Sequence, residues 1–229
     1  MEIFDLDRFQ QRSSVAIIVG CRGSGKSALI RELIQRCSGS APNTTIVAAH
    51  GGDAYVGHEV AREYSPTLVV DALFAQRQRR EQNDVGGGMM VLDDVFFSDK
   101  MINDCQGTTM AFKNGRHWNM KTVVAMQYPL HLSPDMITNV DLVFMFFVPT
   151  TSARRRMYDL YGGQHFFGTF DAFDAALCDA TADFGCLVLD RTNEPQQVWR
   201  YRTAERQTTM SQQQLQQPLM TVDDRILDL

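Results

Sequence analysis

One eight-residue stretch near the start of the chain limits the choice of fold more than any other feature. Gly20–Ser27 reads G-C-R-G-S-G-K-S, so three glycines are followed by a lysine and a serine. The β-branched run Val15–Val19 precedes this stretch, and Ser27–Cys37 follows it with apolar residues at helical spacing. A strand, a glycine-rich loop and a helix in this order predict a loop whose backbone N–H groups bind phosphate oxygens.

The side chains of this phosphate loop predict which ligands it takes. We expect Lys26 to reach the β- and γ-phosphates of a nucleotide and the Ser27 hydroxyl to bind Mg²⁺. ATP and Mg²⁺ are therefore the expected ligands. A glycine-rich turn with an incidental Lys-Ser is the alternative, and the flanking strand and helix argue against it. The residues expected to bind the nucleotide are Gly20, Gly23, Ser24, Gly25, Lys26, Ser27 and Ala28.

Two acids end the next strongly apolar run, Met89–Asp94. A strand ending there would deliver Asp93 to a strand tip neighbouring the phosphate loop, where its carboxylate could hold the Mg²⁺ shell. Asp94 is then the candidate that polarises the attacking water, and a plain turn residue is the alternative. Such a pair of acids favours hydrolysis over a switch function.

A glutamine ends the strand expected at Thr122–Met126. If that strand lies next to the strand that feeds the phosphate loop, the Gln127 amide could contact the γ-phosphate or the water. A polar residue at a strand end, without a catalytic role, is the alternative. With Lys26 and Asp94, Gln127 completes the catalytic candidates that the residues alone suggest.

The pattern along the chain predicts an α/β fold with a mostly parallel central sheet and helices on both faces. Continuous apolar runs alternate with helical patterns, which is typical of such sheets. A small β-hairpin extension, Phe184–Leu189 and Gln197–Tyr201 turned by Asn193-Glu194-Pro195, follows at the C-terminal end. The other strands are expected at Thr44–Ala49, Thr67–Asp71 and Asp141–Val148, and helices at Ala72–Gln82, Asp99–Asn114, after Pro134, at Ser152–Tyr161 and at Asp171–Ala180.

Composition sets the remaining limits. The 229 residues suffice for one α/β domain, which we expect over residues 1–203, followed by a Gln-rich flexible tail over 204–229. The net charge of −5 excludes a uniformly basic nucleic-acid binder, so DNA contacts would need local basic loops. Five scattered cysteines fit a reducing setting, and no apolar run approaches the roughly 18 residues of a membrane span. We expect a soluble protein without membrane insertion.

Beyond these features, the chain resembles the FtsK–HerA superfamily of ring-forming, DNA-pumping P-loop ATPases, and most of all the poxvirus-type genome-packaging ATPases of nucleocytoplasmic large DNA viruses. The resemblance covers about Val15 to Gly163. The superfamily usually carries Asp-Glu where this chain has Asp93-Asp94, so the second acid is shorter here and the Asp pair is closer to the viral branch. The motifs that carry the resemblance are the phosphate loop, Leu92-Asp93-Asp94-Val95, Gly115-Arg116-His117, Met126-Gln127-Tyr128-Pro129, Ile137-Thr138-Asn139-Val140-Asp141 and Ser152-Ala153-Arg154-Arg155-Arg156.

The resemblance implies a RecA-like (ASCE) core that acts as a homo-oligomeric ring, a pentamer or a hexamer. An arginine of one subunit would then reach the γ-phosphate held by its neighbour. Arg116 is the first candidate for this arginine finger, and Arg154 and Arg155 are the second. Solvated helix residues are the alternative for each.

The function that the resemblance implies is an ATP-driven translocase that packages double-stranded DNA into a preformed viral capsid. Its partners would be duplex DNA, further copies of itself, and a capsid or membrane vertex protein. It would work in the cytoplasm of the infected cell, at the viral factory, or in the virion. The alternatives are a cellular or plasmid DNA pump of the same superfamily and a nucleotide-dependent scaffold that does not translocate.

Two further groups are better explained by structure than by function. Arg77, Arg79 and Arg80 could contact DNA phosphates, but the exposed face of a helix is the simpler interpretation. His117, Trp118 and Tyr128 could stack on bases, but single aromatic residues beside buried strands are more often part of the core.

Overall fold

Eight strands form one sheet in the order β3-β2-β4-β5-β1-β6-β7-β8. The computed structural model describes residues 1–11, 15–50, 52–192 and 197–203. The strands are β1 (Val15–Val19), β2 (Asn43–Ala48), β3 (Val60–Ala61), β4 (Gly88–Asp93), β5 (Met120–Met126), β6 (Leu142–Met145), β7 (Cys186–Asp190) and β8 (Gln197–Tyr201).

The strands from β3 to β6 run parallel, and the strand that feeds the phosphate loop lies near the middle. In the register, Ile17 of β1 pairs with Val124 of β5 on one side and Val143 of β6 on the other. Every residue of β1, β4 and β5 is buried, as continuous apolar runs require when both faces of a sheet are covered. The last two strands are antiparallel and extend the same sheet at its edge. The predicted fold class is confirmed.

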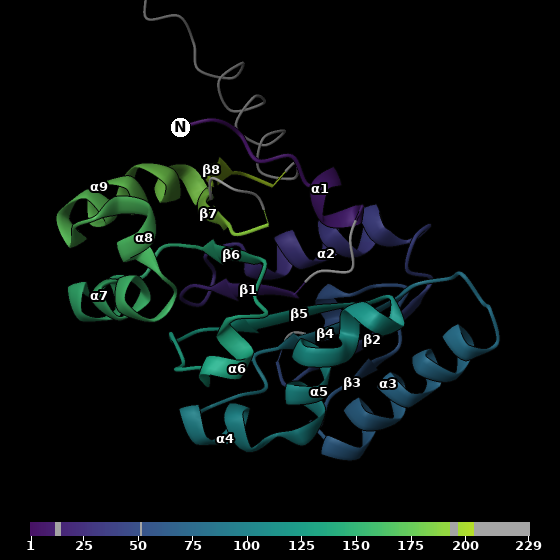
Figure 1. Cartoon of the computed structure of the whole chain (residues 1–229). Helices are drawn as coiled ribbons and strands as arrows, with labels where there is room; N and C mark the ends of the chain where they lie inside the picture. The colour runs from purple at the N-terminus through teal and green to yellow at the C-terminus, as the bar shows by residue number, and fades with distance from the viewer. Residues whose placement is uncertain (12–14, 51, 193–196, 204–229) are drawn as a thin grey trace, which may run out of the picture.

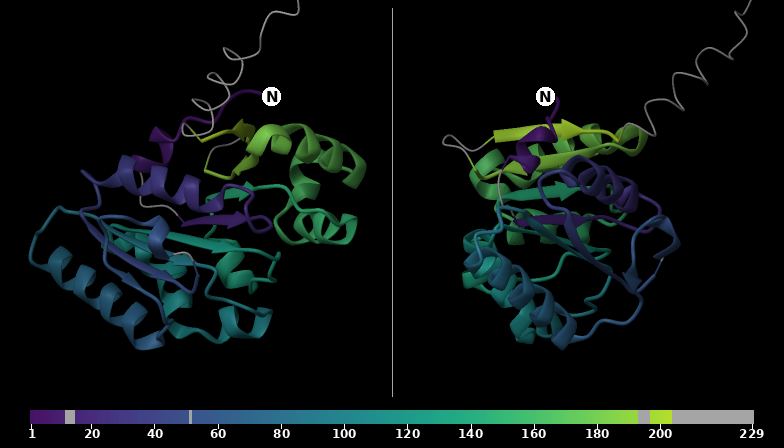
Figure 2. Two further views of the ribbon diagram at one scale, coloured as in Figure 1. Left: turned by 180° about the vertical axis from the view of Figure 1, so that it is seen from behind. Right: turned by 90° about the vertical axis from the view of Figure 1, so that its right-hand side faces the viewer.

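Helices cover both faces of the sheet, and Figures 1 and 2 show the two layers. One core cluster joins the sheet to α1 and α2, and the other joins it to α3, α5, α7 and α9. The helices are α1 (Asp7–Gln10), α2 (Lys26–Cys37), α3 (Pro66–Glu81), α4 (Asp99–Asp104), α5 (Gln106–Asn114), α6 (Pro134–Ile137), α7 (Thr151–Leu160), α8 (Gly163–Phe167) and α9 (Phe170–Thr181).

The strand expected at Thr67–Asp71 is wrong, because these residues form the first turns of α3. Pro66 occupies the first helical position, where its missing N–H costs nothing. Val69, Leu73 and Gln76 are buried at spacings of four and three, so they share one helix face that packs inward. The short β-branched run concealed this helical period.

The single helix expected over Asp99–Asn114 is two helices, α4 and α5. Cys105 separates them in an extended conformation, and its Sγ accepts a hydrogen bond from the Thr108 N–H at 3.3 Å as the N-cap of α5. The hairpin starts at Cys186 rather than Phe184. Helices α1 and α8 and strand β3 were not predicted, and none of the described helices has the length and apolarity to cross a bilayer. The turn at Asn193-Glu194-Pro195 and the tail 204–229 lie outside the described residues.

Candidate nucleotide-binding site

The phosphate loop joins β1 to α2 in the conformation that its glycines permit. Gly23 and Gly25 have φ values of 77° and 116°, a region that side chains with a Cβ rarely adopt. Gly20 is required for a different reason: a Cβ there would lie 2.4 Å from the Cβ of Phe146. The loop therefore depends on glycine for both its turn and its close packing.

Lys26 folds back onto this loop. Its Nζ donates hydrogen bonds to the carbonyls of Gly20 and Cys21, at 2.7 and 3.0 Å. Burial lowers the pKa of the ammonium group, although Asp93 and Asp94 act to raise it. Nearby, the Ser24 Oγ is buried with no hydrogen-bond partner among the described residues. A buried cation and an unsatisfied hydroxyl in a glycine loop fit the oxygen atoms of a polyphosphate.

Asp93 ends β4 at the same edge of the sheet, and Tyr55 holds it in place. The Tyr55 hydroxyl donates a 2.6 Å hydrogen bond to the Asp93 Oδ2, and both side chains are buried. Burial raises the pKa of Asp93, while Tyr55, Lys26 and Ser27 act to lower it. Sequence reasoning missed Tyr55; the signal was its place in the loop after β2, directly after the 3₁₀ helix η1 (Gly52–Ala54).

Asp94 and Gln127 contact each other. Asp94 has a φ of 57°, and its N–H donates to the Ala125 carbonyl of β5 at 3.0 Å, which fixes the turn after β4. The Gln127 Nε2 donates a hydrogen bond to the Asp94 Oδ2. The two residues proposed to handle the water and the γ-phosphate are thus already paired.

These groups line one cleft of about 760 Å³ at the carboxyl edge of the sheet. The strand order corrects one expectation: β5 lies between β1 and β4, so the tips that carry the phosphate loop and Asp93 are not adjacent. Gln127, directly after this intervening strand, is next to the loop, where the Gly20 N–H donates a 3.2 Å hydrogen bond to the Met126 carbonyl. The lining residues are Arg22, Gly23, Lys26, Ser27, His50, Asp93, Asp94, Phe96, Phe97, Gln127, Tyr128 and Leu130.

The side chains of Ser27 and Asp93 suit magnesium. Both line this cleft and offer oxygen atoms, which Mg²⁺ prefers together with water and phosphate oxygens. The described residues contain no cluster of three or more His, Cys, Asp or Glu side chains that could hold a metal ion. Ser27 and Asp93 could hold Mg²⁺ only together with water and the phosphate oxygens of a nucleotide.

Arg116 lies at the opposite edge of the sheet. It belongs to the 3₁₀ helix η2 (Gly115–Trp118), directly before β5 begins. Its guanidinium forms an ion pair with Asp141, which also accepts a 2.9 Å hydrogen bond from the Val15 N–H at the start of β1. Arg116 therefore lies outside the cleft of its own subunit.

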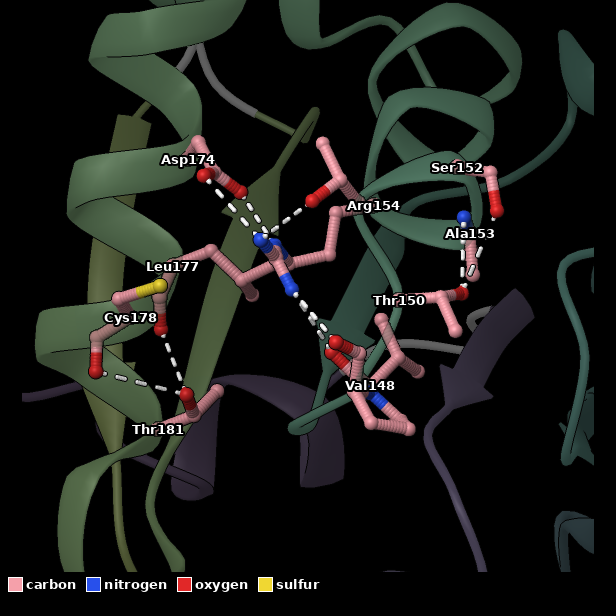
Figure 3. A network of polar contacts seen from close by, with 11 residues as sticks. Val148, Thr150, Ser152, Ala153, Arg154, Asp174, Leu177, Cys178 and Thr181 are labelled. Atoms are coloured by element: carbon pink, nitrogen blue, oxygen red, sulfur yellow. Dashed lines mark hydrogen bonds and ion pairs between the residues drawn. The ribbon is translucent and has the colours of Figure 1, made fainter.

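Arg154 lies inside the fold, where it joins α7 to α9 (Figure 3). It forms an ion pair with Asp174 and donates hydrogen bonds to the carbonyls of Val148 and Pro149, at 3.3 and 3.1 Å. Arg155 is exposed, and its guanidinium carbon lies 4.0 Å from the centroid of the Phe170 ring. Only Arg155 of this pair presents its side chain to solvent.

The remaining polar and aromatic candidates divide by exposure. Trp118 packs against the core, as expected, but His117 and Tyr128 are exposed, so the core interpretation is wrong for these two. Arg77 is exposed on α3 and forms an ion pair with Glu81 one turn later, at 2.8 Å. This arrangement matches the solvated helix face that the sequence favoured.

Comparison with known proteins places the chain among viral proteins. No model of a known protein family matches it. Uncharacterized protein 088R of Invertebrate iridescent virus 3 is 31% identical over 189 residues, which span 78% of this chain and 70% of that protein. The chain belongs to the same family as 088R. Uncharacterized protein L437 of Acanthamoeba polyphaga mimivirus is also similar, with 24% identity over 82% of this chain and 70% of its own length.

Two solved structures share the fold of this 088R-family chain. The genome packaging NTPase B204 of Sulfolobus turreted icosahedral virus 2 aligns with a TM-score of 0.60 and 15% identity, over 83% of this chain and 96% of its own. The pCW3 conjugation coupling protein TcpA aligns with a TM-score of 0.58 and 12% identity, over 88% of this chain and 65% of its own. At such identities the likeness establishes a P-loop NTPase fold, and the poxvirus-type branch stays a prediction.

Proposed function

We propose that this chain is an ATP-hydrolysing motor that moves double-stranded DNA into a viral capsid. The observation that carries the proposal is the meeting of Lys26, Asp93, Asp94 and Gln127 in one cleft at the carboxyl edge of the sheet. A cation on a glycine loop, a buried acid and a second acid with an amide are the groups that phosphoryl transfer to water requires.

Each residue has a separate part in this proposal. Lys26 would exchange its bonds to the Gly20 and Cys21 carbonyls for phosphate oxygens. Asp94 would orient the attacking water and take up its proton as the new P–O bond forms and the bond to the β-phosphate breaks. Ser27 and Asp93 would hold magnesium, which when bound neutralises charge on the phosphate oxygens.

Hydrolysis is tested by turnover with and without duplex DNA. We expect Lys26→Ala and Asp93→Ala each to lower ATP turnover by at least about 100-fold, because Lys26 would bind the phosphates and Asp93 would hold the magnesium. Lys113→Ala and Asp104→Ala, which remove exposed charges on α5 and α4, are the matched controls. If both Lys26→Ala and Asp93→Ala hydrolyse ATP at the parental rate, the assignment of the hydrolytic site is refuted.

Beyond ATP hydrolysis, the proposal includes the packaging of DNA. Two observations support it: relatives in large DNA viruses, and a fold shared with the genome packaging NTPase B204. Duplex DNA, further copies of the chain and a capsid or membrane vertex protein are the partners it requires. DNA-stimulated turnover and movement of a DNA-bound roadblock test it, and turnover indifferent to DNA of any length would contradict it.

A ring is proposed because none of the arginine-finger candidates lines the cleft of its own subunit. Arg116 is half-exposed at the opposite edge, where it could face a neighbour, and Arg155 is the second candidate. Arg116→Ala subunits should therefore regain turnover when mixed with inactive Lys26→Ala subunits. Failure at every mixing ratio would remove Arg116 from this role.

A second candidate function is DNA transfer between cells, and the fold shared with the conjugation coupling protein TcpA favours it. A packaging motor would bind capsid or vertex proteins of its own virus. Copurification of the chain with assembling capsids during infection separates the two functions, and its absence there would favour transfer.

A further inference from the structure

We infer that Phe147 and Phe184 form an aromatic platform beside the phosphate loop that binds the base of the nucleotide. This inference rests on the proposed function, since it assigns the part of the nucleotide that the phosphate loop does not hold. The chemical class recognised is the flat face of a purine or pyrimidine base.

Sheet topology brings both residues to the phosphate loop. Phe147 comes two residues after the end of β6, the second neighbour of β1, and its carbonyl accepts a 3.1 Å hydrogen bond from the Cys21 N–H. Phe184 lies two residues before β7, which runs antiparallel to β6, so the start of β7 meets the same edge. The Phe184 carbonyl lies 3.8 Å from the position that a Cβ on Gly25 would occupy.

The phosphate loop therefore has two flanks of opposite chemistry. On the side of β5 and β4 stand Gln127, Asp94 and Asp93. On the side of β6 and β7 stand the two phenylalanines. A nucleoside triphosphate whose γ-phosphate meets the acids must extend its ribose and base away from them, toward the aromatic flank.

Both phenylalanines are about half exposed. Phe147 is 47% exposed and Phe184 is 48% exposed, whereas Phe146, directly before Phe147 in the chain, is buried. Aromatic side chains present such faces to bases because stacking removes flat apolar surface from water on both partners. Stacking is tolerant of base identity and grows with ring area, so we expect purine nucleotides to bind more tightly than pyrimidine nucleotides.

The backbone around Phe184 is strained, which suggests that the side chain at this position is kept for a purpose. Asp183 and Phe184 have φ values of 53° and 61° within the 3₁₀ helix η3 (Ala182–Phe184), a left-handed conformation that is unusual for a bulky residue. Gly185 follows, where a Cβ would lie 2.2 Å from the Ala180 carbonyl. A glycine at position 184 would relieve the strain, yet the chain keeps a large aromatic ring there.

Phe184→Gly tests the ring, because glycine suits this φ and lets the backbone keep its turn without the side chain. We would measure its affinity, by calorimetry with magnesium present, for ATP and for inorganic tripolyphosphate, which has the phosphates without the base. We expect ATP affinity to fall about tenfold, as for the loss of one stacked base. Tripolyphosphate affinity should not change.

Two further variants control the result. Phe184→Trp keeps a flat ring and should retain ATP affinity. Phe74→Ala removes a similarly exposed phenylalanine, 43% exposed on α3, and should change neither affinity. Phe147→Ala should repeat the selective loss of ATP affinity.

The outcomes separate this inference from the proposed function. Equal loss of ATP and tripolyphosphate affinity in Phe184→Gly would refute the platform and leave only a structural role for the ring. Parental protein that binds tripolyphosphate as tightly as ATP would also refute it, while the phosphate site would stand. Parental protein that binds neither would overturn both.

Discussion

Arg154 is the arginine whose removal should damage the fold rather than the chemistry. Its side chain is 15% exposed and that of Asp174 is 26% exposed, so their ion pair is mostly shielded from water. The same guanidinium satisfies the carbonyls of Val148 and Pro149. Arg154→Met keeps most of the length and removes every one of these bonds.

The loss of stability expected for Arg154→Met depends on the groups that the substitution leaves without a partner. A hydrogen bond to a charged group contributes about 1.5–3 kcal/mol, and an exposed ion pair about 0–1 kcal/mol. For this partly shielded network we expect a loss of about 2–3 kcal/mol in the free energy of unfolding. In a domain of this size that corresponds to a fall in Tm of roughly 4–12 °C.

Thermal unfolding by circular dichroism, beside a double-mutant cycle with Asp174→Asn, measures this effect. The coupling between the two substitutions should be at least about 1 kcal/mol. Arg155→Met is the matched control: it loses only an exposed contact with the Phe170 ring, about 0.5–1 kcal/mol. An unchanged Tm in Arg154→Met together with abolished ATP turnover would refute the structural assignment and return Arg154 to the candidates for the arginine finger.

Two other predictions concern the cleft itself. Gly20→Ala forces a Cβ to within 2.4 Å of the Phe146 Cβ and should lower stability by about 1–3 kcal/mol, measured by urea unfolding, whereas Gly39→Ala, with open space around it, should not. Burial raises the pKa of Asp93 in the folded state above its ordinary value of 3.8. The contribution of Asp93 to the free energy of unfolding is therefore fully present below pH 3.8 and is lost as the pH rises through the folded-state pKa. Asp93→Asn should therefore raise Tm at pH 7.5 and lose that advantage near pH 4; an advantage that persists in acid would contradict this account.

Much of the fold was predictable because its strands are short, continuous apolar runs. Val15–Val19 and Gln197–Tyr201 coincide with β1 and β8, and the first of the two acids, Asp93, ends β4, while Asp94 lies in the turn that follows, since local composition alone marks these strands. The segment Thr67–Asp71 shows the limit: four of its five residues are β-branched or apolar, and such a short run fits a strand and a helix equally well. The position of Pro66 and the contacts of Val69 with the core decide for the helix.

The candidate nucleotide-binding site was likewise predictable only in part. Lys26 and Ser27 follow from a contiguous motif, so their placement needs only local geometry. Tyr55 and Phe184 are linked to the site by sheet order alone, and neither the insertion of β5 between β1 and β4 nor the antiparallel return of β7 can be read from a local pattern. Residues that reach a site through long-range topology are those that sequence reasoning misses.

The hydrogen bond between Gln127 and Asp94 has a consequence for the timing of the proposed ATP hydrolysis. The amide cannot turn to an arriving γ-phosphate while it still holds the carboxylate, so one contact must break before the other forms. ATP that binds completely would thereby release Asp94 to contact water. ATP that binds incompletely would leave Asp94 hydrogen-bonded to Gln127. In the proposed motor, this hydrogen bond would keep Asp94 from the attacking water until ATP is fully bound.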